Sequence, residues 1–406
     1  MPTEINDSKI CIGREPVFNR KCQAIAYELL FRLGNLDTDQ TLDDNAASAQ
    51  LIYDCLMEID LENVFDNKVA YISFPYELLI NKIGHILPTE QVVLEIEENT
   101  EPSDAFLDGM KDLVSEGFSI ALDNFNYDPK WDPILKYTSV VKINVHKKPI
   151  AQIKAQYDIL KKRGVLLLAN GLETETDYDI YHKMGFDYFQ GYFFEKPNII
   201  EKDKLPDNQV AILQLISKLQ NPNISVHEIE ELISQTVTLN YKLFHYINSA
   251  YFNLPRKFDS VREAVAYIGI KKVQYFSSLL ALSDINIKFS ELIVVGLTRA
   301  RMCELMAKKA QLHESQSYFM TGLFSILEAL LSSPLDQILE KLPISPDVVD
   351  ALLYADGALG EALRCSIAYE QCIWDEMKFR ALSSDDISAA YWKAVAWSQG
   401  AAGNLS

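Results

Sequence analysis

The sequence lacks long apolar runs, paired cysteine motifs and an excess of basic residues. No apolar run approaches the roughly 20 residues that a membrane-spanning helix needs, and residues 1–7 have neither the basic nor the apolar region of a signal peptide. The six cysteines are scattered without a CxxC pair, which is typical of reduced cytoplasmic proteins. We therefore expect a cytoplasmic protein without a membrane segment.

The charge balance is strongly acidic, with a formal net charge of −19 over 406 residues. Such a surface repels phosphate backbones and anionic lipid, so we expect binding neither to nucleic acid nor to a membrane surface. A local basic pocket for a small anionic ligand remains compatible with this charge. The length suits two domains, and the 48% of apolar residues are enough to form their cores.

Short apolar runs alternate with amphipathic stretches over about the first 190 residues. The runs lie at 24–30, 69–74, 92–97, 119–125, 140–145, 165–172 and 188–194. Most are apolar on both faces, as parallel strands covered by helices are. Amphipathic stretches such as 103–116 and 150–163 lie between them. This alternation predicts a parallel α/β fold.

Each of these runs carries a polar residue near its end. They are Glu28, Ser73, Glu95, Asp123, Lys142, Asn170 with Glu173, and Gln190. In a (β/α)₈ barrel the carboxyl ends of the strands converge on one face, where active sites lie. An open doubly wound sheet uses only the loops near its switch point. We therefore predict a TIM-like barrel over residues 8–204.

The pattern changes near the charged segment 201–207, and residues 205–398 predict an all-helical domain. Ser225 and Glu228 form a capping box, with Ile224 and Ile229 as a hydrophobic staple. A second capping box is predicted at 260–263, and the pair at 345–346 places serine at an N-cap before a proline. Helical patterns cover 291–310, 320–331, 348–354 and 387–397.

Six short motifs in the first half resemble the EAL domain, a barrel that hydrolyses cyclic di-GMP with two divalent metals. They read YELLFR at 27–32, LEIEE at 94–98, LDNF at 122–125, VKIN at 141–144, ANGLET at 169–174 and QGYF at 190–193. The resemblance covers residues 10–200, and the order and spacing of the motifs make it specific. It implies the same barrel fold.

Seven residues match site positions of that family. The resemblance implies metal binding by Glu28, Glu95 and Asp123 and phosphate contact by Arg32. It also makes Lys142, Glu173 and Gln190 the site lysine, the second glutamate of the strand-6 motif and the site glutamine. A structural alternative is that Glu28 pairs with Arg32, four residues on, and that Lys142 neutralises Glu95 or Asp123 within the barrel mouth.

Three positions depart from the family. Tyr71 stands at the metal-binding asparagine, Asn124 at the second aspartate of the pair, and Asn170 at the glutamate assigned as general base. An amide cannot accept a proton near pH 7, and losing a general base typically costs about 10²–10⁴-fold in rate. We expect no catalytic residue and no metal, with Mg²⁺ or Mn²⁺ needed only for residual activity.

The second half resembles the HDOD domain, a helical relative of the HD phosphohydrolases without their metal residues. The segments LNYKLFHYINSAYF at 239–252 and AVAYIGI at 264–270 carry this resemblance. The chain contains no His-Asp dipeptide, so no hydrolase metal site is expected there. Binding of a protein partner by these helices is implied by the family alone.

Taken with the barrel, these observations predict a non-catalytic bacterial signalling scaffold that acts through protein–protein contacts and is not an enzyme. Two alternatives stay open. The retained Arg32, Lys142 and Gln190 favour a cyclic di-GMP receptor, and the four retained carboxylates favour residual phosphodiesterase activity.

Overall fold

The computed structural model describes residues 10–33, 68–74, 87–97, 103–195, 223–235, 260–270, 291–340 and 344–403, together with isolated positions between them. The chain divides into two compact units. One comprises Met1–Lys196 with Glu370–Asp375, and the other comprises Pro197–Tyr369 with Glu376–Ser406. The boundary predicted at residues 204 and 205 lies outside the described residues.

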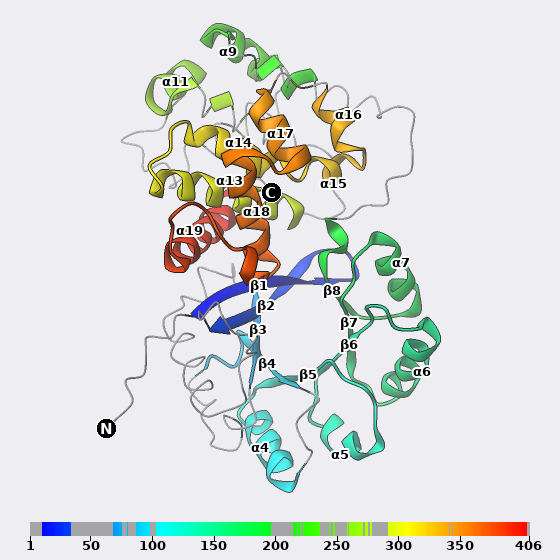
Figure 1. Ribbon diagram of the computed structural model, residues 1–406. Coiled ribbons are helices and arrows are strands. Elements are labelled where there is room, and N and C mark those ends of the chain that lie inside the picture. Colours follow the sequence, from blue (N-terminus) through cyan, green and yellow to red (C-terminus); the bar gives the residue numbers. More distant parts are fainter. Residues whose placement is uncertain are drawn as a thin grey trace, which may run out of the picture. The chain divides into compact units, whose positions relative to one another are not determined.

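The first unit is a closed eight-stranded barrel, with the strands in sequence order around the ring (Figure 1). The strands are β1 (Ile10–Asn19), β2 (Ala24–Leu33), β3 (Val69–Ser73), β4 (Val92–Glu97), β5 (Ser119–Asp123), β6 (Val140–Asn144), β7 (Leu166–Asn170) and β8 (Tyr188–Gln190). Strands β2 to β8 pair in parallel, whereas β1 is antiparallel to both neighbours. The predicted TIM-like barrel is confirmed, with an antiparallel first strand.

Strand β1 was not predicted from the sequence, so the run at 24–30 is the second strand and not the first. The centre of β1 contains Gly13 and Pro16, residue types that are depleted in strands. A tight turn after β1 joins it to β2, with the Asn19 amide donating to the Gln23 carbonyl at 3.0 Å. Cys22 takes a left-handed backbone (φ 58°) in that turn. The antiparallel pairing therefore depends on a local hairpin.

Helices lie outside the ring of strands (Figure 1). They are α4 (Asp104–Ser115), α5 (Asp132–Leu135), α6 (Ile150–Lys161) and α7 (Glu175–Met184), with the 3₁₀ turns η2 (Pro129–Trp131) and η3 (Tyr192–Phe194). Thr174 and Asp177 form a capping box at the start of α7, and Gly185 ends that helix with a φ of 108°. These four helices lie outside the strands on their side of the ring, as expected for parallel strands covered by helices.

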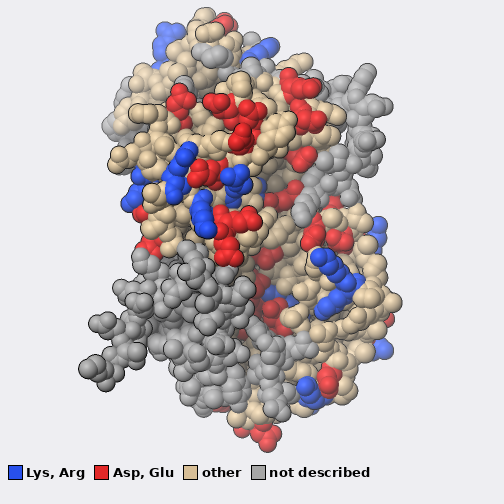
Figure 2. All heavy atoms as spheres, viewed as in Figure 1, with Lys and Arg blue, Asp and Glu red and all other residues tan. Residues whose placement is uncertain are grey.

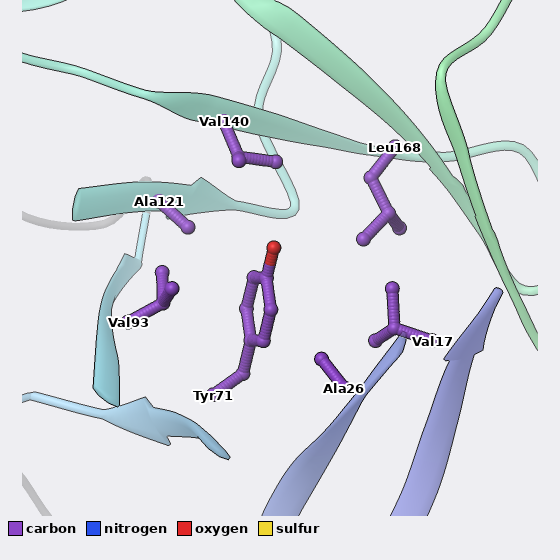
Figure 3. Close-up of a cluster of buried hydrophobic side chains, with 7 residues drawn as sticks. All are labelled: Val17, Ala26, Tyr71, Val93, Ala121, Val140 and Leu168. Carbon is purple, nitrogen blue, oxygen red and sulfur yellow. The ribbon is translucent and has the colours of Figure 1, made fainter. Parts of the chain in front are cut away.

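The barrel interior is built in two layers of inward-facing side chains. The lower layer is an apolar cluster of Val17, Ala26, Tyr71, Val93, Ala121, Val140 and Leu168 (Figure 3). Side chains two residues apart on a strand share a face. Two residues further along each parallel strand stand the polar groups noted in the sequence, so they form the next layer toward the mouth.

The second half of the chain is helical, and no strand occurs among its described residues. Its helices are α9 (Val226–Gln235), α11 (Val261–Ile268), α13 (Glu291–Lys309), α14 (Ser315–Phe324), α15 (Leu327–Leu331), α16 (Leu335–Leu339), α17 (Pro346–Tyr354), α18 (Gly357–Glu370) and α19 (Ser384–Gly403), with the 3₁₀ turn η5 (Trp374–Glu376). The long α13 packs against α14 and α19. The predicted all-helical fold is confirmed.

Local signals in this half were mostly sound. The Ser225 hydroxyl accepts from the Glu228 amide at 3.2 Å, and the Glu228 carboxylate accepts from the Ser225 amide at 2.7 Å. The predicted helix at 320–331 is instead divided between α14, which ends at Phe324, and α15, which begins at Leu327. Between them, the Ser325 hydroxyl donates to the Gly322 carbonyl at 2.7 Å. Helix α18 was missed because its glycines lower helix propensity.

Among the described residues, no helix is long and apolar enough to span a bilayer. On the face seen in Figure 2, the described Lys and Arg side chains are interspersed with Asp and Glu rather than gathered in one basic patch. This distribution agrees with the acidic net charge of −19.

Candidate functional site

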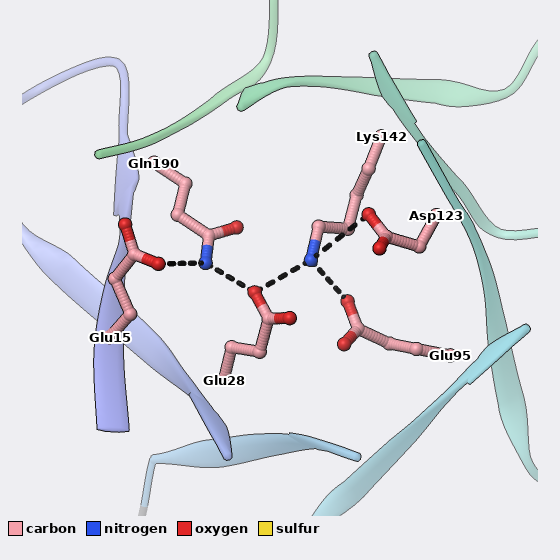
Figure 4. A network of polar contacts seen from close by, with 6 residues as sticks. All are labelled: Glu15, Glu28, Glu95, Asp123, Lys142 and Gln190. Atoms are coloured by element: carbon pink, nitrogen blue, oxygen red, sulfur yellow. Dashed lines mark hydrogen bonds and ion pairs between the residues drawn. The ribbon is translucent and has the colours of Figure 1, made fainter. Parts of the chain in front are cut away.

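Lys142 lies at the centre of the polar layer at the barrel mouth (Figure 4). Its Nζ is 2.7 Å from Glu28 Oε2, 2.6 Å from Glu95 Oε1 and 3.4 Å from Asp123 Oδ1. The Lys142 side chain has no solvent exposure. Four residues that the sequence marked on four strands are therefore brought together, including the pairing of Lys142 with Glu95 and Asp123 that was offered as a structural alternative.

Gln190 extends this network to a fifth strand. Its Nε2 donates to Glu28 Oε2 and, at 3.2 Å, to Glu15 Oε2. Gln190 is fully buried, and its Oε1 accepts no hydrogen bond from the described part of the chain. The result is a continuous line of contacts from Glu15 on β1 to Asp123 on β5 (Figure 4).

Strand direction explains why Glu15 joins the network. On β2, β4, β5 and β6 the network residue stands two positions after a member of the apolar cluster. Because β1 runs antiparallel, its network residue stands two positions before Val17 instead. Glu15 is also the register partner of Glu28. Glu15 was not among the predicted site residues, because its strand β1 was not predicted. Its inverted spacing indicates an inward position only once β1 is known to be antiparallel.

Burial and crowding shift the pKa values of these groups. Burial, with the nearby Glu28 charge, raises the pKa of Glu15 from 4.5 to about 8. Burial and the Glu28 charge also hold the pKa of Glu95 well above its usual value. Burial alone would raise the pKa of the more exposed Glu28, but the Lys142 ammonium lowers it. Burial opposes the charge on Lys142, yet Glu28 and Glu95 hold its pKa well above 10.5.

The donor set has the chemistry of a site for a hard divalent cation. Three carboxyl groups, those of Glu28, Glu95 and Asp123, share one lysine. Asp123 Oδ1 is buried, pairs with Lys142 and accepts no hydrogen bond from any described residue. Carboxylate oxygens are what Mg²⁺ and Mn²⁺ prefer. In the described residues no three acidic, histidine or cysteine side chains are already placed to hold a metal; Lys142 Nζ stands between these carboxylates.

Two matched residues do not contribute to the described network. Glu173 is about half exposed, and its carboxylate lies 3.3 Å from His146 Nδ1 rather than beside Lys142. The backbone of Arg32 belongs to β2, opposite Cys11, but its side chain lies outside the described residues. The alternative pairing of Glu28 with Arg32 therefore lies outside the described residues. Among the described residues, Glu28 pairs with Lys142.

Tyr71 lies in the apolar layer and not among the carboxylates. Its side chain projects from β3 into the middle of the cluster, with its hydroxyl toward Val140 and Leu168 (Figure 3). Burial and the Glu95 charge raise the pKa of its phenol, so Tyr71 is neutral and packs as a core residue. The β3 residue in line with the polar layer is Ser73.

The two asparagines take different positions. Asn124 follows β5 in a left-handed conformation (φ 47°) and is exposed; asparagine tolerates this backbone better than most residues do. Asn170 ends β7, is half-buried and stands two residues beyond Leu168 of the apolar cluster. Asn170 therefore belongs to the inward polar layer, whereas Asn124 marks the turn that leaves it.

Parts of this chain are similar to known proteins. The HDOD domain model matches residues 205–333. The protein "Cyclic di-GMP phosphodiesterase CdgJ" of Vibrio cholerae serotype O1 is 32% identical over 400 residues, covering 96% of this chain and 92% of the relative. "Uncharacterized protein YuxH" of Bacillus subtilis is 27% identical, covering 96% of this chain and 98% of the relative. A standalone EAL protein from Vibrio cholerae O395, solved with c-di-GMP bound, is 19% identical, with a TM-score of 0.38 over 47% of this chain and 92% of that chain.

The relative CdgJ overturns two expectations. A non-catalytic scaffold and a chain that is not an enzyme were predicted, yet a protein alike over nearly the whole length is named a phosphodiesterase. The physical error was to treat the two amides as the loss of the whole centre. Glu28, Glu95 and Asp123 still converge on Lys142, and Gln190 joins them by donating to Glu28.

Proposed function

Because this chain belongs to the family of two-domain EAL–HDOD proteins that includes CdgJ, we propose that it is a cyclic di-GMP phosphodiesterase whose site is the barrel mouth. The reaction adds water to one phosphodiester of the cyclic dinucleotide and breaks one P–O bond. Its product is a linear dinucleotide with a terminal phosphate.

The observation that carries this proposal is the convergence of Glu28, Glu95 and Asp123 on Lys142. A buried ammonium can offset charge on a phosphate, and preorganised charges of this kind act strongly in a site that excludes water. Each buried charge has a desolvation cost. A barrel interior with a purely structural role would therefore not require three carboxyl groups around one lysine.

The proposed activity needs Mg²⁺ or Mn²⁺. When bound, such an ion lowers the pKa of an attacking water and neutralises phosphate oxygens. Glu28, Glu95 and Asp123 are the residues that would hold it, and the convergence of their oxygens on Lys142 Nζ supports this assignment. Asn170 can orient a water but cannot take its proton, so turnover slower than with a carboxylate at that position is part of the proposal.

A second candidate is a receptor that binds cyclic di-GMP without turning it over. Asn170 in the polar layer favours it, because an amide there keeps hydrogen bonding and removes a base. Lys142 and Gln190 would then act only in binding. Binding without hydrolysis distinguishes this candidate from the enzyme.

The test is hydrolysis by the purified full chain with Mg²⁺ or Mn²⁺, followed by chromatography of the nucleotide. The expected result is a linear dinucleotide that accumulates with wild type and not with Glu28→Ala. Product formed equally by both would be contamination and would count against the proposal. Calorimetric binding without product supports the receptor, and neither binding nor product rejects both candidates.

Two further expectations belong to this proposal. A cytoplasmic location is expected from the six scattered cysteines, and a protein partner for the helical domain is expected from its family. Co-purification from cell extract, with the full chain as bait, would test the expected protein partner.

A further inference from the structure

The backbone of Gln190 is fixed on both sides. Its carbonyl accepts from the Leu172 amide at 3.1 Å, and Val17 is its register partner on β1. The next residue, Gly191, has a φ of 130°, and a Cβ there would lie 2.2 Å from the Leu172 carbonyl oxygen. The position of Gln190 is therefore set by close backbone packing, and only its side-chain torsions are left to be determined.

Two carboxyl groups determine the orientation of the Gln190 amide. Nε2 donates to Glu28 and Glu15, whereas Oε1 can only accept hydrogen bonds. Rotating the amide by half a turn would place Oε1 against both carboxyl groups. With both N–H groups held, Oε1 points away from Glu15 (Figure 4).

The remaining polar atom of the Gln190 side chain is Oε1. It is buried in a side chain without solvent exposure and accepts no hydrogen bond from the described residues. Buried acceptors in proteins are nearly always satisfied, and a lost partner costs free energy. An acceptor beside Glu28 and Lys142 that no described residue satisfies is the arrangement expected when the ligand supplies the donor.

We propose that Glu15 is a positioning residue for the reaction: it holds the Gln190 amide so that Oε1 accepts a hydrogen bond from an O–H group in the mouth, either the attacking water or a hydroxyl of the nucleotide. This inference rests on the proposed function. Glu15 acts through its hydrogen bond to Gln190 and not through its charge, because only an acceptor is needed to hold an N–H group.

Two substitutions separate these roles. Glu15→Gln keeps an acceptor of the same length and removes the charge, whereas Glu15→Leu removes both at similar size. Turnover of cyclic di-GMP by each full-length variant is measured with Mn²⁺, with thermal unfolding as a check on folding. We expect Glu15→Leu to lower the rate about tenfold, the scale of one hydrogen bond, and Glu15→Gln to stay within about twofold of wild type.

The kinetic constants identify the donor. A fall in kcat at constant KM indicates the attacking water, whereas a rise in KM at constant kcat indicates a nucleotide hydroxyl. A Glu15→Gln variant as impaired as Glu15→Leu would show that charge matters and would overturn the proposal. Wild-type turnover by Glu15→Leu would overturn it as well.

A readout without turnover keeps this inference separate from the proposed function. In full-length protein labelled with side-chain ¹⁵N-glutamine, the Gln190 signals are assigned with Gln190→Leu. Glu15→Leu should move the two Gln190 amide protons toward the shifts of a solvated glutamine, and Glu15→Gln should leave them near wild type. Unmoved signals in Glu15→Leu contradict positioning, whereas an inactive wild type with the expected shifts contradicts only the phosphodiesterase proposal.

Discussion

Lys142 Nζ lies 2.6 Å from Glu95 Oε1, and the exposed fractions of the two side chains are 0% and 4%. A buried pair of this kind is expensive to break, because removing one partner leaves the other charged and unsolvated. The same ammonium also pairs with Glu28 and Asp123, so among the described residues Lys142 balances the charge of three carboxyl groups.

Lys142→Met should therefore destabilise the barrel strongly. Without metal at pH 7, we expect the free energy of unfolding to fall by about 3–5 kcal/mol, measured by urea denaturation. Lys154→Met is the matched control, because Lys154 pairs with Asp158 on the surface with both side chains about half exposed. That control should change stability by less than about 1 kcal/mol. Equal effects of the two substitutions would show that the buried network is not formed.

The raised pKa of Glu15 predicts a pH dependence of stability. Folding favours the protonated carboxyl, because its pKa rises from 4.5 to about 8. Without metal, stability from this group should therefore be lost as pH rises from about 4.5 through about 8 and should level off above that. Glu15→Gln has no proton to lose, so its thermal midpoint should fall less over this range. Parallel curves for wild type and variant would exclude a raised pKa at Glu15.

Tyr71 is predicted to act as a core residue. Tyr71→Phe keeps the ring in its apolar cluster and should cost less than about 1.5 kcal/mol. Tyr71→Asn, which restores the residue type of the EAL resemblance, opens a cavity and buries an amide, so we expect a loss of about 3–5 kcal/mol in urea unfolding. A stable Tyr71→Asn variant would indicate that Tyr71 lies outside the cluster.

Asn170→Glu should raise the rate of hydrolysis. Asn170 stands in the inward polar layer, and a general base typically contributes about 10²-fold or more. We expect at least tenfold faster hydrolysis, measured with Mn²⁺ at saturating cyclic di-GMP. Asn124→Asp is the control: Asn124 is exposed on a left-handed turn, and its rate should stay within about twofold. A faster Asn124→Asp with an unchanged Asn170→Glu would reverse these assignments.

The barrel could be predicted from the sequence because apolar runs and amphipathic stretches alternate regularly along it. Runs that are apolar on both faces and end in a polar residue identify parallel strands. The polar residues of four such strands, Glu28, Glu95, Asp123 and Lys142, do lie in contact. Prediction failed where the geometry is not periodic. The strand that carries Glu15 contains glycine and proline and runs antiparallel, so neither its propensity nor its spacing matched the other strands.

The sequence also could not predict how far along the barrel axis each inward-facing side chain lies. Tyr71 and Ser73 are both inward on β3, and only the stagger of the strands decides which of the two reaches the layer of the carboxylates. Glu173 was grouped with the site by motif, yet the chain turns after Asn170 through Gly171 at a φ of 80° and pairs Glu173 with His146. Motif order alone could not resolve these one-layer differences.

Single-turnover hydrolysis tests whether the barrel mouth breaks a phosphodiester bond of cyclic di-GMP. An excess of the full-length protein is incubated with labelled cyclic di-GMP and Mn²⁺, so that even slow chemistry converts the bound nucleotide. We expect linear dinucleotide in a reaction that EDTA stops and that Glu28→Ala abolishes. Nucleotide that stays cyclic after many hours, although it is bound, would show that the barrel mouth is not a phosphodiesterase site.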